Sequence, residues 1–150
     1  MLRTARPEDR AAVEAIVEAA YSIYLERIGK PPGPMLDDYA RLVETGAVSV
    51  LEEPGGALAA IIVLVPKADH LLLDNIAVRP DRQGDGLGCR LIAFAESEAR
   101  RLGHAELRLY THVTMTENIA LYARLGFVET GRGRAAGYDR VFMTKLLGRD

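Results

Sequence analysis

The order of apolar and amphipathic segments predicts an α/β fold with a mixed, mostly antiparallel central sheet and helices on both of its faces. One short strand and two helical segments come first, and three consecutive strands follow. The rest of the chain is a helix, a strand, a helix and two strands. Consecutive strands favour antiparallel pairing, whereas strands separated by helices favour crossover connections that cover the sheet. At 150 residues, the chain is expected to form one domain, residues 1–150, with a sizeable core.

The composition excludes several functional classes. Lys and Arg total 19 against 21 Asp and Glu, so the balance of charge favours neither nucleic acid nor an anionic membrane surface as a partner. One cysteine leaves no intrachain disulfide, which is typical of a reducing compartment, and a cytoplasmic location is expected. We expect neither a secretory leader nor a membrane-spanning segment.

Turn-forming residues divide the first half of the chain. Pro7 suits the first position of a helix, and Gly29 and Gly46 suit the residue after a helix end. Pro54-Gly55-Gly56 separates two apolar runs, as in a hairpin. The segments predicted here are a strand at Leu2–Arg6, helices at Pro7–Ile28 and Asp37–Glu44, and hairpin strands at Ala47–Glu52 and Ala57–Val65.

The second half alternates strands with amphipathic helices. The predicted segments are a strand at His70–Val78, a helix at Gly88–Leu102, a strand at Ala105–Tyr110, a helix at Met115–Leu125, a strand at Phe127–Thr130, a flexible turn at Gly131–Gly137 and a strand at Tyr138–Leu147. One apolar face of the longer helix is predicted to hold Leu87, Leu91, Phe94, Ala95 and Leu102. Thr114 and Glu117 have capping-box spacing, and Gly126 suits the left-handed residue after the second helix.

The stretch from Leu71 to Gly88 carries the clearest functional signal. A buried strand ends at Pro80, and Gly84, Gly86 and Gly88 then lead into a helix. Glycines let backbone N–H groups approach a ligand closely. The first turn of a helix adds N–H groups without helical partners and a partial positive charge. These features together predict a site for a phosphate or pyrophosphate.

The spacing of the glycines narrows the phosphate ligand. Lys and Ser or Thr are missing after the last glycine, so the segment is not a P-loop. Leu91 stands where a dinucleotide fingerprint needs a third glycine or alanine. A nucleotide or dinucleotide module is therefore the least favoured of the alternatives.

Two blocks resemble the GCN5-related N-acetyltransferase (GNAT) family. Gln83-x-x-Gly86-x-Gly88 is similar to that family's acetyl-CoA motif Q/R-x-x-G-x-G/A, which follows a strand ending like Ile76 and Val78 here. A later block is similar to the family's helix ending in Leu-Tyr, three residues and Gly-Phe. The matching residues are Leu121, Tyr122, Gly126 and Phe127. Met115 and Asn118 stand where the family often has Asn and Ala, and this is a departure from the pattern.

The resemblance implies the GNAT acyl-CoA acyltransferase fold and an N-acetyltransferase. Such an enzyme transfers an acetyl group from acetyl-CoA to a primary amine, which attacks directly in a ternary complex. Tyr122 matches the family's tyrosine acid, which protonates the leaving thiolate. Its alternative role is packing in the core. The implied acetyl-CoA contacts are Ile76, Ala77, Val78, Gln83, Gly84, Asp85, Gly86, Leu87, Gly88 and Asn118.

The acceptor and the general base stay open. Asp74, four residues before Val78, is the carboxylate nearest to it, and Tyr24 is a second candidate to contact the acceptor. Asp74 could instead bond to a neighbouring loop, and Tyr24 could pack in the core. Other candidate bases are His70, Tyr110 and His112, and the other candidate acceptor neighbours are Arg27, Met35, Asp38 and Tyr39. Asp37 and Asp38 suit a cationic amine, whereas Arg27, Lys30, Arg132 and Arg134 suit an anionic acceptor.

Further alternatives concern activity, metal and assembly. A non-catalytic acyl-CoA sensor on the same fold is the second functional hypothesis, because no base is obvious. The spacing of His70, His104, His112 and Cys89 suggests no metal site, and Cys89 is better explained as a small residue beside the cofactor than as a nucleophile. The resemblance also implies a possible homodimer.

Overall fold

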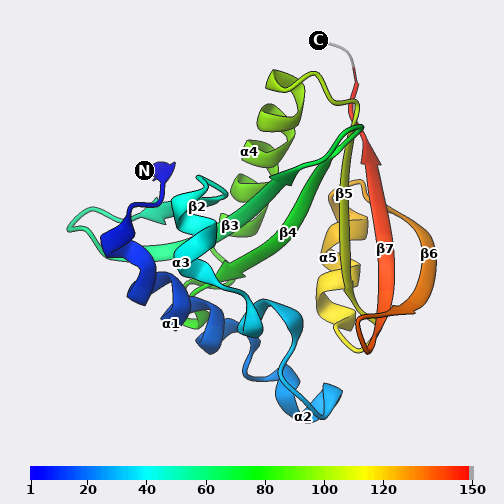
Figure 1. The fold of residues 1–150 in the computed structure, drawn as a ribbon, viewed down its shortest axis with the longest axis horizontal. Coiled ribbons are helices and arrows are strands. Elements are labelled where there is room, and N and C mark those ends of the chain that lie inside the picture. The colour runs from blue at the N-terminus through cyan, green and yellow to red at the C-terminus, as the bar shows by residue number, and fades with distance from the viewer. Residues whose placement is uncertain (149–150) are drawn as a thin grey trace. The chain divides into compact units, whose positions relative to one another are not determined.

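The computed structural model describes residues 1–148, which divide into two compact units (Figure 1). Unit 1 comprises Met1–Leu64 and Asn75–Leu91, and unit 2 comprises Val65–Asp74 and the chain from Ile92 onward. The seven strands follow the sheet order β1-β2-β3-β4-β5-β7-β6. One described strand pair is parallel and the other four are antiparallel, which confirms the mixed, mostly antiparallel fold class.

Unit 1 carries the N-terminal helices and the first three strands. α1 and α3 are in contact, and α3 begins where Asp38 accepts a hydrogen bond from the backbone N–H of Arg41. The elements of unit 1 are β1 (Leu2–Thr4), η1 (Pro7–Asp9), α1 (Arg10–Tyr21), α2 (Tyr24–Ile28), η2 (Gly33–Leu36), α3 (Tyr39–Glu44), β2 (Val48–Glu52), most of β3 (Leu58–Pro66), the end of β4 (Leu71–Val78), η3 (Pro80–Arg82) and the first turn of α4 (Leu87–Arg101).

The prediction of a single helix over residues 7–28 is wrong in one respect, because these residues form three shorter helical segments. A 3₁₀ turn precedes α1, and α1 and α2 are separated by Ser22 and Ile23. Leu25 N donates to the carbonyl of Ser22 at 3.2 Å, a bond of three-residue span that tightens the chain at this break. Gly29 ends α2 with φ 83°, as predicted.

The core of unit 1 is built on β2 and β3, the predicted hairpin. Their antiparallel register pairs Val48 with Val63 and Val50 with Ile61. Residues 58–63 of β3 are all buried, so this strand is covered on both faces.

Unit 2 holds the start of β4, the rest of α4, and the C-terminal strands. β4 and β5 are parallel, with Leu71 beside Leu107, and β7 lies antiparallel between β5 and β6. Side chains alternate on β5, where Leu107 and Leu109 are buried and their neighbours are half-buried. The elements not yet bounded are β5 (Glu106–His112), α5 (Thr116–Arg124), β6 (Val128–Ala135) and β7 (Tyr138–Leu146).

The flexible turn predicted over Gly131–Gly137 is wrong, because most of it belongs to β6. Arg132 pairs with Val141 and Gly133 with Arg140, so the backbone of these residues joins the sheet despite its glycines. Only Ala136 and Gly137 form the turn, with φ 52° and 83°. Positive φ at both central residues is the geometry of a two-residue hairpin loop.

Two predictions about helix ends also fail. Thr114 does not cap α5: the N-cap is Met115, which has no side-chain cap bond, and Thr114 bonds to the ring of His112. Leu102 lies just past the end of α4 and is 38% exposed, because the helical periodicity stops at Arg101. Leu87, Leu91 and Ala95 are buried as predicted.

Candidate functional site

The loop between β4 and α4 has the geometry of an anion site. After η3, Gly84 and Gly86 have φ 90° and 79°, a conformation that favours glycine. Arg90 N donates to the carbonyl of Gly86 at 3.2 Å, so the helical ladder starts there. The N–H groups of Leu87, Gly88 and Cys89 come before that first bond, at the positive end of a 15-residue helix. Backbone N–H groups at this end can therefore hold a phosphate.

The charged side chains of this loop neutralise one another. Glu53, in the turn between β2 and β3, lies 3.1 Å from the guanidinium of Arg79 and 2.6 Å from that of Arg82. Arg82 also pairs with Asp85 at 3.1 Å, and Arg79 pairs with Asp81 at 2.6 Å, a contact that lowers the pKa of Asp81. Two cations thus face three carboxylates, so the attraction for an anion falls on the backbone N–H groups.

The end of β4 is held by polar bonds on both sides. The amide of Gln83 donates to the carbonyl of Val78 at 3.3 Å, and the Tyr21 hydroxyl lies 2.9 Å from the carbonyl of Ile76. Asn75 is buried, and its side chain bonds to the hydroxyls of Tyr21 at 2.7 Å and Tyr39 at 2.9 Å. These bonds fix the orientation of the strand segment that contains Ile76, Ala77 and Val78.

The predicted acceptor neighbours in unit 1 have structural partners. Tyr24 is buried, its ring lies 6.2 Å from that of Tyr21, and the Arg27 guanidinium stands 5.4 Å from its centroid. The Tyr39 hydroxyl bonds to the carbonyl of Pro34. The Asp38 side chain caps α3 by accepting a hydrogen bond from the backbone N–H of Arg41. Contacts within unit 1 therefore give these side chains a structural role.

In unit 2, α5 carries the tyrosine of the second block. Tyr122 is 5% exposed, and its ring meets that of Phe127 edge-on at 5.6 Å. Gly126 has φ 98°, which lets the chain turn after α5, and Phe127 N donates to the carbonyl of Tyr122 at 3.0 Å. Asn118, one turn before Tyr122, is half-buried, with its amide nitrogen 3.8 Å from the sulfur of Met115.

Side chains from two other strands of unit 2 contact Tyr110, which lies on β5. The Tyr110 hydroxyl donates to a carboxylate oxygen of Asp74 at 3.1 Å, joining β5 to β4. The guanidinium of Arg140, on β7, lies 4.1 Å from the centroid of the Tyr110 ring. The structure thus gives Asp74 a sheet neighbour as its partner, instead of the loop considered from the sequence.

Residues 13–127 match the model of the Acetyltransferase (GNAT) family. The chain belongs to this family. It is 39% identical to the [Ribosomal protein bS18]-alanine N-acetyltransferase of Escherichia coli (strain K12) over 74 residues, 49% of this chain and 50% of that protein. It is also 39% identical to the IAA acetyltransferase of Azospirillum brasilense over 72 residues, 47% of each. The chain thus spans about half the length of the curated relatives it matches.

Solved structures of GNAT acetyltransferases share the fold. The ribosomal-protein-S18-alanine N-acetyltransferase from Escherichia coli superposes with a TM-score of 0.77 at 24% identity, over 100% of this chain and 95% of that one. At 24% identity, this similarity is evidence for a shared fold. It agrees with the GNAT architecture predicted from the two sequence blocks.

The other base candidates of this GNAT chain have defined partners. His70 Nδ1 lies 2.7 Å from Asp69, and this contact is the main cause that lowers the pKa of the Asp69 carboxyl. The N–H of Thr114 donates to His112 Nδ1 at 3.2 Å, so a neutral His112 ring carries its proton on Nε2. The lone pair of that ring then lies on Nδ1, where it already accepts a hydrogen bond from Thr114, so it is not free to take a proton from a substrate.

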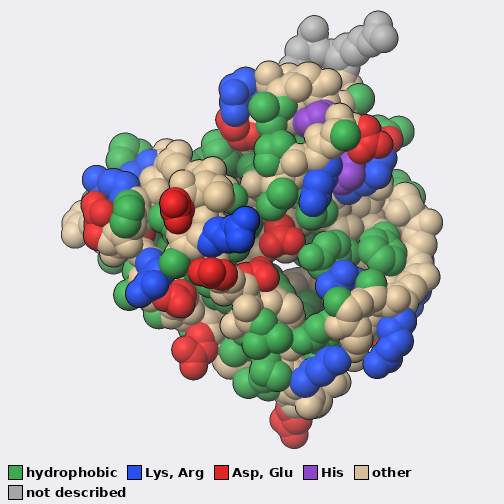
Figure 2. All heavy atoms as spheres, in the orientation of Figure 1, with side chains coloured by type: hydrophobic (Ala, Val, Ile, Leu, Met, Phe, Trp, Pro, Cys, Tyr) green, Lys and Arg blue, Asp and Glu red, His purple; other side chains and the backbone are tan. Residues whose placement is uncertain are grey.

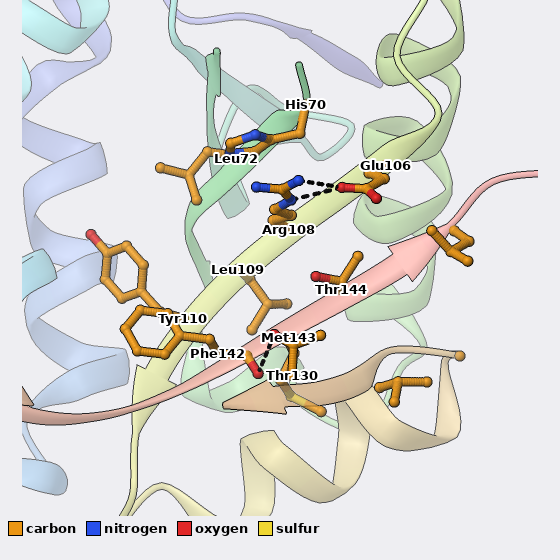
Figure 3. A pocket seen from close by; sticks show the side chains of 13 residues that line it. His70, Leu72, Glu106, Arg108, Leu109, Tyr110, Thr130, Phe142, Met143 and Thr144 are labelled. Atoms are coloured by element: carbon orange, nitrogen blue, oxygen red, sulfur yellow. Dashed lines mark hydrogen bonds and ion pairs between the residues drawn. The ribbon is translucent and has the colours of Figure 1, made fainter. Parts of the chain in front are cut away.

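An open pocket of about 830 Å³ lies on the sheet face of unit 2 (Figure 3). Tyr110 and Phe142 meet at one end of the view, and His70, Arg108 and Glu106 gather at the other. The full lining is His70, Leu72, Glu106, Arg108, Leu109, Tyr110, Gly126, Val128, Thr130, Phe142, Met143, Thr144 and Leu146.

The remaining features concern a free thiol, metal ligation, membrane-spanning helices and surface charge. Cys89 is a free, exposed thiol in the first turn of α4. Residues 1–148 contain no cluster of three His, Cys, Asp or Glu side chains arranged to hold a metal ion. Within the same part of the chain, no helix combines the length and apolar character that crossing a membrane requires. Figure 2 shows Lys and Arg interspersed with Asp and Glu over the visible face.

Sequence reasoning missed two residues of interest, Glu53 and Arg140. Both act through partners far away along the chain: Glu53 pairs with Arg79 and Arg82, and Arg140 covers Tyr110. The sequence carries no local pattern that would have revealed either contact.

Proposed function

We propose that this chain is an N-acetyltransferase that moves an acetyl group from acetyl-CoA to a primary amine, which attacks the thioester directly. Membership of the GNAT family and the loop from Gln83 to Gly88 support this proposal. The single observation that carries it is the pair of left-handed glycines leading into the N-terminus of α4.

The loop residues take the pyrophosphate in this proposal. The backbone N–H groups of Gly84, Asp85, Gly86, Leu87 and Gly88 serve as donors, and Gln83 braces the strand end through Val78. Ile76, Ala77 and Val78 hold the pantetheine arm through their backbone. The N–H of Val78 is the proposed donor to the oxyanion that develops on the acetyl group.

Residues of α5 are proposed to protonate the leaving thiolate and to contact the CoA arm. Tyr122 is proposed to protonate the thiolate of CoA as it leaves, since a phenol of ordinary pKa about 10 can donate to a thiolate whose conjugate acid has pKa about 8.5. Asn118 lies one turn earlier on α5 and is proposed to contact the CoA arm.

The acceptor is proposed to be a primary amine that binds near Asp74 and Tyr24. One relative is named for alanine of a ribosomal protein, so a peptide with an N-terminal alanine is a reasonable first acceptor. Family membership favours this enzyme over a non-catalytic acyl-CoA sensor.

Calorimetric titration with acetyl-CoA tests the cofactor, with NAD and ATP as controls. Gly86→Ala and Gly103→Ala form a matched pair, because both glycines have φ near 80° and open space around an added methyl group. We expect saturable binding of acetyl-CoA alone, weakened by Gly86→Ala and unchanged by Gly103→Ala. Absence of acetyl-CoA binding to the wild type would overturn the proposed function.

Release of CoA thiol tests the transfer. The acceptors are an octapeptide beginning with alanine, the same peptide acetylated at its N-terminus, and a set of small primary amines. We expect release with a free amine and none with the blocked peptide. Tight acetyl-CoA binding without release from any of these amines would favour the sensor instead.

A further inference from the structure

Asp74 and Tyr110 form a bonded acid–base pair in unit 2, and Tyr110 lines the open pocket there. Their oxygens are 3.1 Å apart, and the hydroxyl of Tyr110 is the donor. Both side chains are half-buried, so they are partly shielded from water and still accessible. A carboxylate that accepts from a phenol can take the proton of that phenol when the phenol oxygen receives another.

Arg140 contacts the Tyr110 ring of this pair. Its guanidinium lies over the ring of Tyr110, 4.1 Å from the centroid, and β5–β7 register places Tyr110 beside Phe142. The Phe142 ring meets the Tyr110 ring nearly edge-on at 6.4 Å. The ring is thus held between a cation and an aromatic side chain, which fixes the position of the phenol oxygen. A positive charge at the ring also stabilises negative charge on the phenol oxygen.

We propose that Asp74 and Tyr110 together remove the proton that the attacking amine must lose. This inference rests on the proposed acetyl transfer. As the nitrogen–carbon bond forms, the nitrogen–hydrogen bond breaks and the proton passes to the Tyr110 oxygen. The original Tyr110 proton moves to Asp74, so Tyr110 ends as a phenol and Asp74 as a neutral carboxylic acid that later releases its proton to water.

The rival titratable groups on this face are less suited. His112, two residues after Tyr110 on β5, carries its proton on Nε2, and Arg108, two residues before, is a cation paired with Glu106 at 2.5 Å. His70, before the start of β4, is paired with Asp69. Of the groups that face Tyr110 from β4, β5 and β7, Asp74 is the carboxylate to which it is bonded.

The test is a double-mutant cycle with Asp74→Asn and Tyr110→Phe, assayed with acetyl-CoA and the alanine octapeptide. Each single change is expected to lower kcat about 100-fold and to leave the KM for acetyl-CoA within about twofold. The double variant is expected to be no slower than the worse single variant, because the two groups act as one unit. Asp139→Asn, on β7 and paired with Arg134 at 3.3 Å, is the matched control.

The pH profile separates proton removal from packing. The wild-type rate should level off above the pKa of the peptide amine, about 8. The rates of both variants should keep rising, because hydroxide must then take the proton. Folding is verified by melting temperatures and by acetyl-CoA affinity, both of which should stay near those of the wild type.

Three outcomes would overturn the inference: wild-type kcat in either single variant, independent effects that multiply in the double variant, or unchanged pH profiles. A wild type that binds acetyl-CoA and acetylates no amine would instead refute the transferase proposal, and this inference with it. If a single variant unfolds, Asp74→Glu supplies the second measurement, since it keeps the carboxylate and should retain most of the turnover.

Discussion

Lys145 on β7 donates a hydrogen bond from its ammonium group to the carbonyl of Leu125 at 2.6 Å, where α5 ends. The same ammonium lies 2.5 Å from the carboxylate of Glu96 on α4. One cation thus satisfies a helix C-terminus and a half-buried carboxylate in unit 2. Favourable contact between a cation and the last carbonyls of a helix is expected from the helix dipole.

Replacing Lys145 by Met should destabilise unit 2. The change removes the bond to Leu125 and leaves Glu96, whose side chain is 17% exposed, without its cation. A loss of about 1–3 kcal/mol is expected from urea unfolding. Arg101→Met is the control, because Arg101 pairs with Glu98 at the surface and should cost less than about 1 kcal/mol. Equal losses in the two variants would contradict the role of Lys145.

Gly126→Ala should destabilise the chain more than Gly103→Ala. Both glycines have positive φ, 98° and 80°, so each alanine should cost about 1–2 kcal/mol. At Gly126, the added carbon would also lie 3.1 Å from Cε of Lys145, whereas nothing lies within 4 Å at Gly103. The difference should shrink in a Lys145→Ala background, because alanine lacks the Cδ, Cε and Nζ atoms that would meet the added carbon. A difference that persists there would exclude Lys145 as its cause.

Glu53→Gln should weaken acetyl-CoA binding without unfolding the chain. Glu53 joins Arg79 and Arg82 to the turn between β2 and β3, so its charge helps to hold the loop that precedes α4. Calorimetry should show a Kd about tenfold higher, equivalent to about 1.4 kcal/mol. Glu129→Gln removes a similar ion pair on β6, with Arg132, and should bind as the wild type does. An unchanged Kd for Glu53→Gln would show that the loop needs no such brace.

Tyr122→Phe should lower turnover and spare cofactor affinity. The proposed acid is lost, and kcat should fall about 100-fold or more, within the range for general acid catalysis. The ring that packs on Phe127 is retained, so the variant should stay folded. Phe127→Leu is the matched packing variant, and it should lower stability more than turnover. Wild-type turnover in Tyr122→Phe would refute the proton-donor role.

Asp9→Asn should make the free energy of unfolding less dependent on pH in the acid range. Asp9 accepts bonds from both terminal nitrogens of Arg3 at 2.7 and 3.1 Å and from Arg6 N at 2.7 Å. The Arg3 bonds hold the pKa of Asp9 below its ordinary value. A lowered pKa in the folded state adds stability above the unfolded value of about 3.9, and this stability is lost as pH falls through the folded value.

Urea midpoints at pH 6 and pH 3 measure this contribution. The wild type should lose more stability between the two pH values than Asp9→Asn does. Asp139→Asn, at an exposed pair, should follow the wild type. Equal losses in wild type and Asp9→Asn would show that Asp9 does not couple stability to pH.

The amino-acid sequence alone predicted most of the element order, the glycine-rich loop before α4 and the family resemblance. Those features depend on residues close together in the chain: Gln83, Gly86 and Gly88 set a loop and a helix start within six positions. The left-handed conformation of Gly126 was predictable for the same reason. Local spacing failed where sheet pairing overrode it, since the glycines of residues 131–133 entered β6 by bonding to β7.

Only the tertiary structure decided which polar side chains meet. Asp74 and Tyr110 are 36 residues apart, and parallel pairing of β4 with β5 brings them together. Arg140 reaches Tyr110 through the β5–β7 register, and Asn75 finds Tyr21 and Tyr39 from helices far earlier in the chain. Such contacts depend on strand register and helix packing, which set the distances between side chains and are not encoded in any short pattern of residues.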